Sequence, residues 1–107
     1  MPRNLPEAFA AALAGDAPPA AWSAPLAALW WLARDPAGPG ANDWARAHAL
    51  VQDAPGPDAA WVHAHLHRIE GDAGNARYWY GRAGRPESRD SLEAERATLV
   101  AALAATA

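Results

Sequence analysis

The sequence predicts an all-α protein of about six helices. Alanine supplies more than a quarter of the residues, and alanine, leucine and arginine all favour helix. Proline and glycine recur along the chain and divide the alanine-rich stretches into segments of helical length. Almost nothing shows the alternation of apolar and polar residues that is typical of a strand. A chain of 107 residues is long enough for a single domain, residues 1–107, with its own core.

Helix-breaking residues mark the elements in the first half of the chain. The first helix is expected over residues 6–14, with Asn4 as its N-cap and a proline in its first turn. The second is expected over residues 23–34, where a proline again lies in the first turn and leucines recur at helical spacing. The segment 35–41 holds two prolines and two glycines, so we expect a loop there.

Four more helices are expected in the second half of the chain. They are predicted over residues 43–52, 58–70, 73–83 and from residue 90 to near the C-terminus. Asn42 is expected to cap the helix over residues 43–52, and Asp72 the helix over residues 73–83. Asp90 and Glu93 have the spacing of a capping box at the start of the last one. Only Gly71 and Asp72 separate the helix over residues 58–70 from the helix over residues 73–83, so the chain is expected to fold back there.

The composition argues against several classes of protein. The chain has no cysteine, which removes disulfides and thiolate metal sites and favours a reducing compartment, the cytoplasm. A net charge of −3 lacks the positive field that attracts nucleic acid. The apolar run near the N-terminus is too short and too interrupted for a signal peptide or a membrane span. We therefore expect no nucleic-acid or membrane partner.

Two segments of the chain resemble each other. The run DWARAHALV, which begins at Asp43, and the run DAGNARYWY, which begins 29 residues later, both place an alanine at the fifth position. A repeated helix pair of this length is typical of arrays of antiparallel helical hairpins, in which each unit buries its apolar face by stacking on the next. The repeat predicts hairpins over residues 23–53 and 58–84.

The second of these hairpins resembles a tetratricopeptide repeat. The residues that carry the resemblance are Trp61, Gly71, Asp72, Ala76, Tyr80, Ala83 and Pro86. The resemblance implies a right-handed array of hairpins, closed by a C-terminal capping helix. The earlier hairpin matches the pattern poorly, because residues 35–41 form an insertion in it. The run LHRIEGDAGNARYWYGRAG also resembles a family of small uncharacterised bacterial and fungal proteins, and this likeness implies no activity.

The helix over residues 58–70 carries an apolar face with polar side chains along its margin. Val62, Leu66 and Ile69 share the apolar face, which we expect to pack against Ala76 and Tyr80 of the following helix. The polar side chains beside that face are His63, His67 and Glu70. Two imidazoles one turn apart followed by a carboxylate could hold zinc or another divalent metal, with His48 as a further ligand. The favoured alternative is that both histidines simply form hydrogen bonds at a half-buried boundary.

A second polar face is predicted on the helix over residues 73–83. Asn75, Tyr78 and Arg82 lie on it, and the two aromatic or cationic side chains could hold an anionic or planar ligand. Whether this face and the histidine face form one groove depends on the direction of the two helices. Arg82 also belongs to a cluster of arginines over residues 68–89, which we expect to be a solvated surface paired with nearby carboxylates.

Most tryptophans are expected in the core, because a small alanine-rich domain needs large side chains to fill its interior. Trp30 and Trp31 are adjacent on a helix and cannot both face the same core. Trp31 or Trp22 is therefore a candidate contact for a partner.

These patterns leave three functions to compare. The first is a helical module that binds a protein or peptide, including a second copy of itself as a homodimer. The alternative is a protein that binds a small ligand or metal through His63, His67, Glu70, Asn75, Tyr78 and Arg82. Enzymatic activity is less expected, because no nucleophile elbow, phosphate loop or cofactor fingerprint accompanies the histidines.

Overall fold

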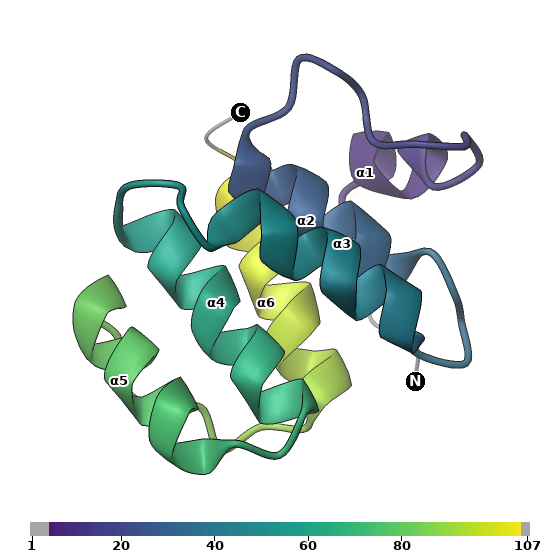
Figure 1. Ribbon diagram of the computed structural model, residues 1–107. Helices are drawn as coiled ribbons and strands as arrows, with labels where there is room; N and C mark the ends of the chain where they lie inside the picture. The colour runs from purple at the N-terminus through teal and green to yellow at the C-terminus, as the bar shows by residue number, and fades with distance from the viewer. Residues whose placement is uncertain (1–4, 106–107) are drawn as a thin grey trace.

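The computed structural model describes residues 5–105, and these form six helices with no strand among them (Figure 1). The helices are α1 (Glu7–Ala12), α2 (Ala24–Ala33), α3 (Ala41–Val51), α4 (Pro57–Ile69), α5 (Ala73–Ala83) and α6 (Leu92–Ala104). The prediction of an all-α fold with about six helices is confirmed. The element boundaries agree with the expected ranges to within a few residues.

The helix caps differ from the expected ones at two places. Asn42 is not a cap, because α3 begins before it and the backbone N–H of Gly40 donates to the Asp43 carboxylate at 3.1 Å. Ser91, rather than the expected Asp90, caps α6, and its hydroxyl accepts from the backbone N–H of Ala94 at 3.0 Å. Both corrections shift a helix start by one or two residues, which sequence patterns resolve poorly. The expected cap at Asn4 lies outside the described residues.

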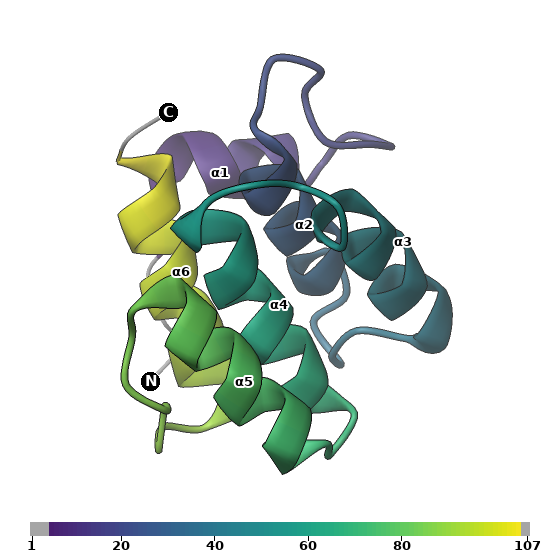
Figure 2. The same cartoon turned by 60° about the vertical axis from the view of Figure 1, so that its left-hand side comes forward.

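The turn between α4 and α5 agrees with its sequence signals. Gly71 has φ +83°, a left-handed conformation that glycine adopts without a steric penalty. The Asp72 carboxylate accepts from the backbone N–H of Asn75 at 3.2 Å and so caps α5 as expected. The chain reverses at this turn, and α5 lies alongside α4 (Figure 2).

Helix α4 is the central element of the fold. It packs against α2, α3, α5 and α6, and α5 makes the most extensive of these contacts. All residues from Ala59 to His67 are consequently buried, including three histidines. The expected apolar face is confirmed at Val62 and Leu66, whereas His63 and His67, which were expected at a half-buried boundary beside it, are buried. Ile69, which was expected in the core, is only half-buried because it lies in the last turn of the helix.

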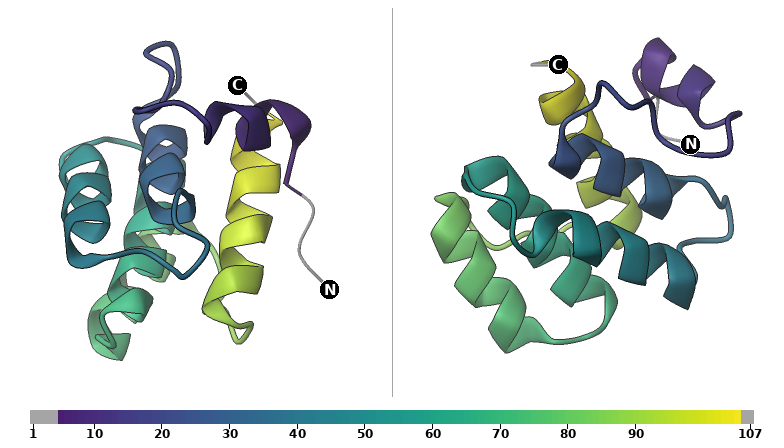
Figure 3. Two further views of the ribbon diagram at one scale, coloured as in Figure 1. Left: turned by 90° about the vertical axis from the view of Figure 1, so that its right-hand side faces the viewer. Right: turned by 45° about the horizontal axis from the view of Figure 1, so that its top comes forward.

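Four of the other helices, α2, α3, α5 and α6, pack around α4. Helix α2 packs extensively on α3, while α6 contacts both α2 and α4 (Figure 3). The two pairs, α2 with α3 and α4 with α5, meet mainly where α3 contacts α4. The candidate site described below lies at this junction.

The tryptophans divide between the core and its margin. Trp30 is 1% exposed, and its indole N–H donates to the carbonyl of Ala12 at 2.8 Å, which ties α2 to α1. Trp31 is half-buried and meets the Trp30 ring edge-on, so the expectation that these two cannot share one core position is confirmed. Trp22 stacks on Phe9 with ring centroids 5.5 Å apart.

No helix among the described residues is both long and apolar enough to cross a bilayer.

Candidate metal centre

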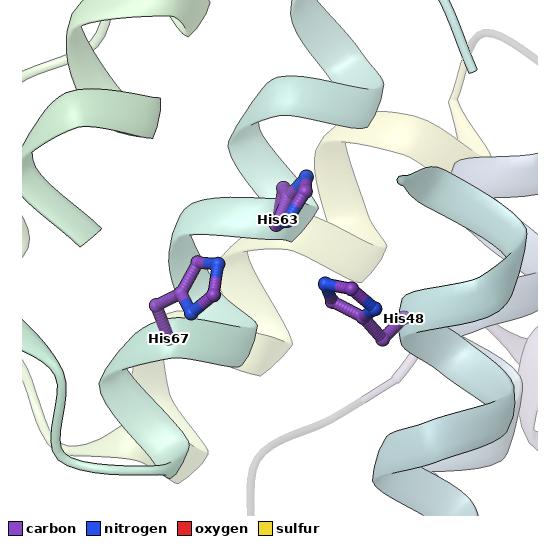
Figure 4. A group of neighbouring side chains, drawn as sticks. All are labelled: His48, His63 and His67. Carbon is purple, nitrogen blue, oxygen red and sulfur yellow. The ribbon is translucent and has the colours of Figure 1, made fainter. Parts of the chain in front are cut away.

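Three histidines gather where α3 meets α4. His63 and His67 lie one turn apart on α4, and His48 reaches them from α3 (Figure 4). One ring nitrogen from each of the three lies within 4.8 Å of the others. The sequence predicted the two histidines of α4 as a pair and named His48 as a further ligand that depended on the fold. The packing of α3 on α4 supplies that third group.

Aromatic rings enclose this cluster. The indole of Trp44 stacks on His48 with ring centroids 4.8 Å apart, and the indole of Trp79 stacks on His63 at 3.9 Å. His48 meets His63 edge-on at 4.8 Å, while His63 and His67 are stacked at 4.9 Å. These contacts surround the imidazoles with apolar surface and hold their ring planes in defined orientations.

The Nδ1 atom of His63 is buried and has no hydrogen-bond partner among the described residues. The residue is 4% exposed, so bulk water does not satisfy this nitrogen either. Burial, together with the neighbouring His48 and His67, lowers the pKa of His63 to about 4. Burial also lowers the pKa of His48. At neutral pH both rings are therefore neutral, and a neutral imidazole has a nitrogen lone pair that can bind a metal.

His67 is held by a carboxylate. Its Nδ1 lies 2.5 Å from the Oε1 of Glu70, three residues along the chain. A carboxylate at this position accepts a hydrogen bond from Nδ1–H, so the free lone pair of the ring is on Nε2. The same arrangement is found behind many metal-binding histidines. Glu70 was predicted as a third ligand alongside His63 and His67. In the structure it instead orients one of the three imidazoles.

The other predicted ligand-binding residues do not share a groove with the histidines. Asn75 is exposed and donates from its side chain to the Asp72 carboxylate at 3.2 Å. Tyr78 is 54% exposed, and its hydroxyl accepts from Arg82 at 2.9 Å. The two polar faces remain apart because His63 and His67 are enclosed between helices, whereas these three side chains lie on the outer surface of α5. A second group of side chains that could hold a metal ion is mostly exposed. It consists of His67, Glu70 and Asp72.

Comparisons of the chain with protein families, with curated proteins and with solved structures each found no match.

A buried polar network on the opposite side of α4 was not anticipated from the sequence. Glu95 of α6 is 3% exposed and accepts hydrogen bonds from His65 at 2.6 Å, from Arg68 at 2.7 Å and from the Tyr80 hydroxyl. Burial alone would raise the pKa of this carboxyl, but the hydrogen bonds outweigh burial and lower the pKa of Glu95. Burial and the Glu95 carboxylate raise the pKa of Tyr80. The network joins α4, α5 and α6 through one carboxylate.

One sequence signal did point to this network. Leu92 and Leu99 flank Glu95 at helical spacing, which places that carboxyl on the apolar face of α6. A carboxylate on such a face needs buried donors. His65 could not be assigned as one of them without knowing how α4 and α6 pack.

Proposed function

We propose that this protein binds a divalent transition metal through His48, His63 and His67. The observation that carries the proposal is that three imidazole nitrogens from two helices lie within 4.8 Å of one another, while the buried Nδ1 of His63 has no other partner. A polar atom left unsatisfied in a protein interior costs about 1 to 3 kcal/mol, and a metal bond would remove that cost.

The chemistry of the three ligands indicates which ions fit. Neutral imidazole suits zinc, copper, nickel and iron, whereas magnesium and calcium require oxygen ligands. Zinc bonds to histidine are about 2.0 to 2.1 Å long, so its tetrahedral ligands lie about 3.3 Å apart. The three nitrogens lie within 4.8 Å of one another, so each pair would have to approach by at most about 1.5 Å to reach that separation. Three protein ligands leave a fourth position for water or another small ligand.

Metal titration of the chelator-treated protein tests this proposal. Zinc is titrated in competition with a chromophoric chelator, and native mass spectrometry counts the bound ions. We expect one zinc per chain, and we expect the His48→Gln variant to lose it. His48 is the most suitable position because it is only half-buried, so the substitution leaves the core intact. No binding of zinc, copper or nickel by the wild-type protein at micromolar concentration would contradict the proposal.

A matched variant separates the two histidine-containing groups. Asp72 belongs to the exposed group with His67 and Glu70 but not to the three-histidine cluster. The Asp72→Asn variant keeps a capping side chain at the start of α5. We expect it to bind zinc as the wild type does. Loss of zinc in Asp72→Asn, with retention in His48→Gln, would place the ion at the exposed group instead.

A second candidate function is the binding of a protein or peptide on a tetratricopeptide-like scaffold. Two features support it: α2 packs extensively on α3 and α4 on α5, as in paired antiparallel hairpins, and Tyr78 is a large exposed side chain on α5. Trp22 and Trp31 support it less, because Trp22 stacks on Phe9 and Trp31 packs on Trp30. Light scattering tests self-association. A dimer that Tyr78→Ala dissociates would favour this function, and a monomer at high concentration would argue against a homodimer.

A further inference from the structure

An open pocket in the described part of the chain lies away from the histidine cluster. It is an open pocket of about 500 Å³ between the loop that follows α2 and the N-terminal half of α6. Pockets that bind small molecules generally have volumes of about 300 to 1,000 Å³. Leu5, Ala33 and Val100 supply apolar wall, while the charged side chains around it are Asp35, Glu93 and Arg96.

Among the described residues that line this pocket, Arg96 is the only basic one. Its Nε donates to the Nε2 of His65 at 3.3 Å, which is consistent with a neutral His65 whose Nδ1–H donates to Glu95. The two terminal nitrogens of Arg96 have no hydrogen-bond partner among the described residues. Burial lowers the pKa of Arg96 even though Glu93 and Glu95 raise it. The terminal nitrogens of Arg96, which no described residue uses, are therefore available to a ligand anion.

The charges around the pocket do not favour a simple anion. Two carboxylates and one guanidinium give the lining a net negative charge. Both carboxylate residues are exposed at the pocket, and Asp35 uses one oxygen to accept from the backbone N–H of Ala37 at 2.9 Å. Glu93 and Arg96 are three residues apart on α6, so their side chains project from one face about 5 to 6 Å apart at Cβ. A carboxylate and a guanidinium this close together are complementary to an ammonium and a carboxylate on a single small molecule.

We propose that this pocket binds an α-amino acid with an apolar side chain. The ligand carboxylate contacts Arg96, its ammonium contacts Glu93, and its side chain packs against the apolar wall at Leu5 and Ala33. Asp35, on the opposite side, offers a second acceptor for the ammonium. The site shares no residue with the proposed metal centre, so each can be tested without the other.

A titration with leucine and its truncated analogues tests the proposal. The probes are leucine, 4-methylpentanoate without the ammonium, 3-methylbutylamine without the carboxylate, and glycine without the side chain. Binding is followed by the amide NMR signals of the labelled protein around Gly38 and Ala97, which line the pocket. We expect leucine to bind most tightly and each analogue to bind at least about tenfold more weakly, because each lacks one group that the pocket contacts.

Two variants and a control locate the bound ligand. Arg96→Gln and Glu93→Gln should each weaken leucine binding about tenfold. Glu93 is exposed, so its substitution serves even if the Arg96 variant proves unstable. Arg89→Gln alters an exposed arginine outside the pocket and should bind leucine normally. The proposal is overturned if no amide signal responds to millimolar leucine, if 4-methylpentanoate binds as tightly as leucine, or if Glu93→Gln binds as the wild type does.

Discussion

His63 of α4 lies face to face with Trp79 of α5, with ring centroids 3.9 Å apart and an interplanar angle of 14°. The indole covers the imidazole and helps to exclude water from it, while His48 and His67 approach from other directions. A positive charge on His63 would be poorly solvated and close to two further imidazoles. The folded state therefore favours the neutral form of His63.

The stability of the metal-free protein should fall between pH 6.5 and pH 4. The pKa of His63 is about 4 in the folded state, against 6.5 in an unfolded chain. Within this range the unfolded state binds a proton that the folded state does not, so the free energy of unfolding decreases as the pH falls. The difference in pKa corresponds to a loss on the order of 3 kcal/mol by pH 4. Urea unfolding in the presence of a chelator measures it.

The control for this experiment is His63→Gln, which replaces the imidazole with a polar side chain that does not titrate. The variant should show a shallower decrease in stability over the same pH range. The lowered pKa values of His48 and His65 leave some residual dependence of the same sign. Equal slopes in the wild type and the variant would show that His63 is not the group responsible.

Removal of the Glu70 carboxylate should weaken metal binding without unfolding the protein. Glu70 is exposed and contacts the Nδ1 of His67 at 2.5 Å. Loss of such a carboxylate behind a metal ligand typically reduces affinity by about 10- to 100-fold. We expect Glu70→Ala to show this loss in a chelator competition, and Glu70→Gln, which keeps an acceptor oxygen, to show a smaller one. Zinc affinity in Glu70→Ala equal to that of the wild type would remove this role.

Substitution of Glu95 should destabilise the fold strongly. In Glu95→Gln the carboxylate that accepts from His65, Arg68 and Tyr80 is lost, and the cation and two polar groups remain without an adequate partner. Breaking a buried ion pair in this way costs on the order of 3 kcal/mol. The exposed pair between Arg77 and Glu87 provides the comparison. Glu87→Gln should cost less than about 1 kcal/mol in the same urea titration. Similar costs for both substitutions would argue against a stabilising network.

Loss of the cap at the start of α5 should have a smaller effect. The Asp72 side chain accepts from the backbone N–H of Asn75, and removal of an N-cap costs about 1 kcal/mol. We expect Asp72→Ala to lower the free energy of unfolding by this amount. Asp53 is exposed and forms no hydrogen bond or ion pair with any described residue, so Asp53→Ala should leave stability nearly unchanged. A cost for Asp53→Ala as large as that for Asp72→Ala would indicate a general charge effect.

Local sequence signals predicted much of the secondary structure. The proline in the first turn of α2, the cap at Asp72 and the turn at Gly71 all lie at the expected positions. These signals depend on conformational preferences of a few adjacent residues. The start of α6 was predicted less well, because Asp90 and Ser91 are both good capping residues and only the geometry distinguishes them.

The candidate site could be predicted only in part. The i, i+4 spacing of His63 and His67 follows directly from helix geometry, so their proximity could be predicted. The approach of His48, the ring contact of Trp79 with His63 and the donors around Glu95 depend on how separate helices pack. Tertiary contacts of this kind leave no fixed spacing in a single sequence. His63 and His67 were expected at a half-buried boundary, but both are buried, with an aromatic or a carboxylate neighbour.

The enclosure of α4 by four other helices has a consequence for how the protein opens. An amide in the middle of this helix can exchange with solvent only after its neighbours have moved away. The backbone around Ala64 should therefore show the slowest hydrogen exchange in the molecule, with an opening free energy close to that of complete unfolding. Amides on the outer side of α5, around Arg77, should exchange through local fraying. The most slowly exchanging segment would then be the one that carries His63 and His67.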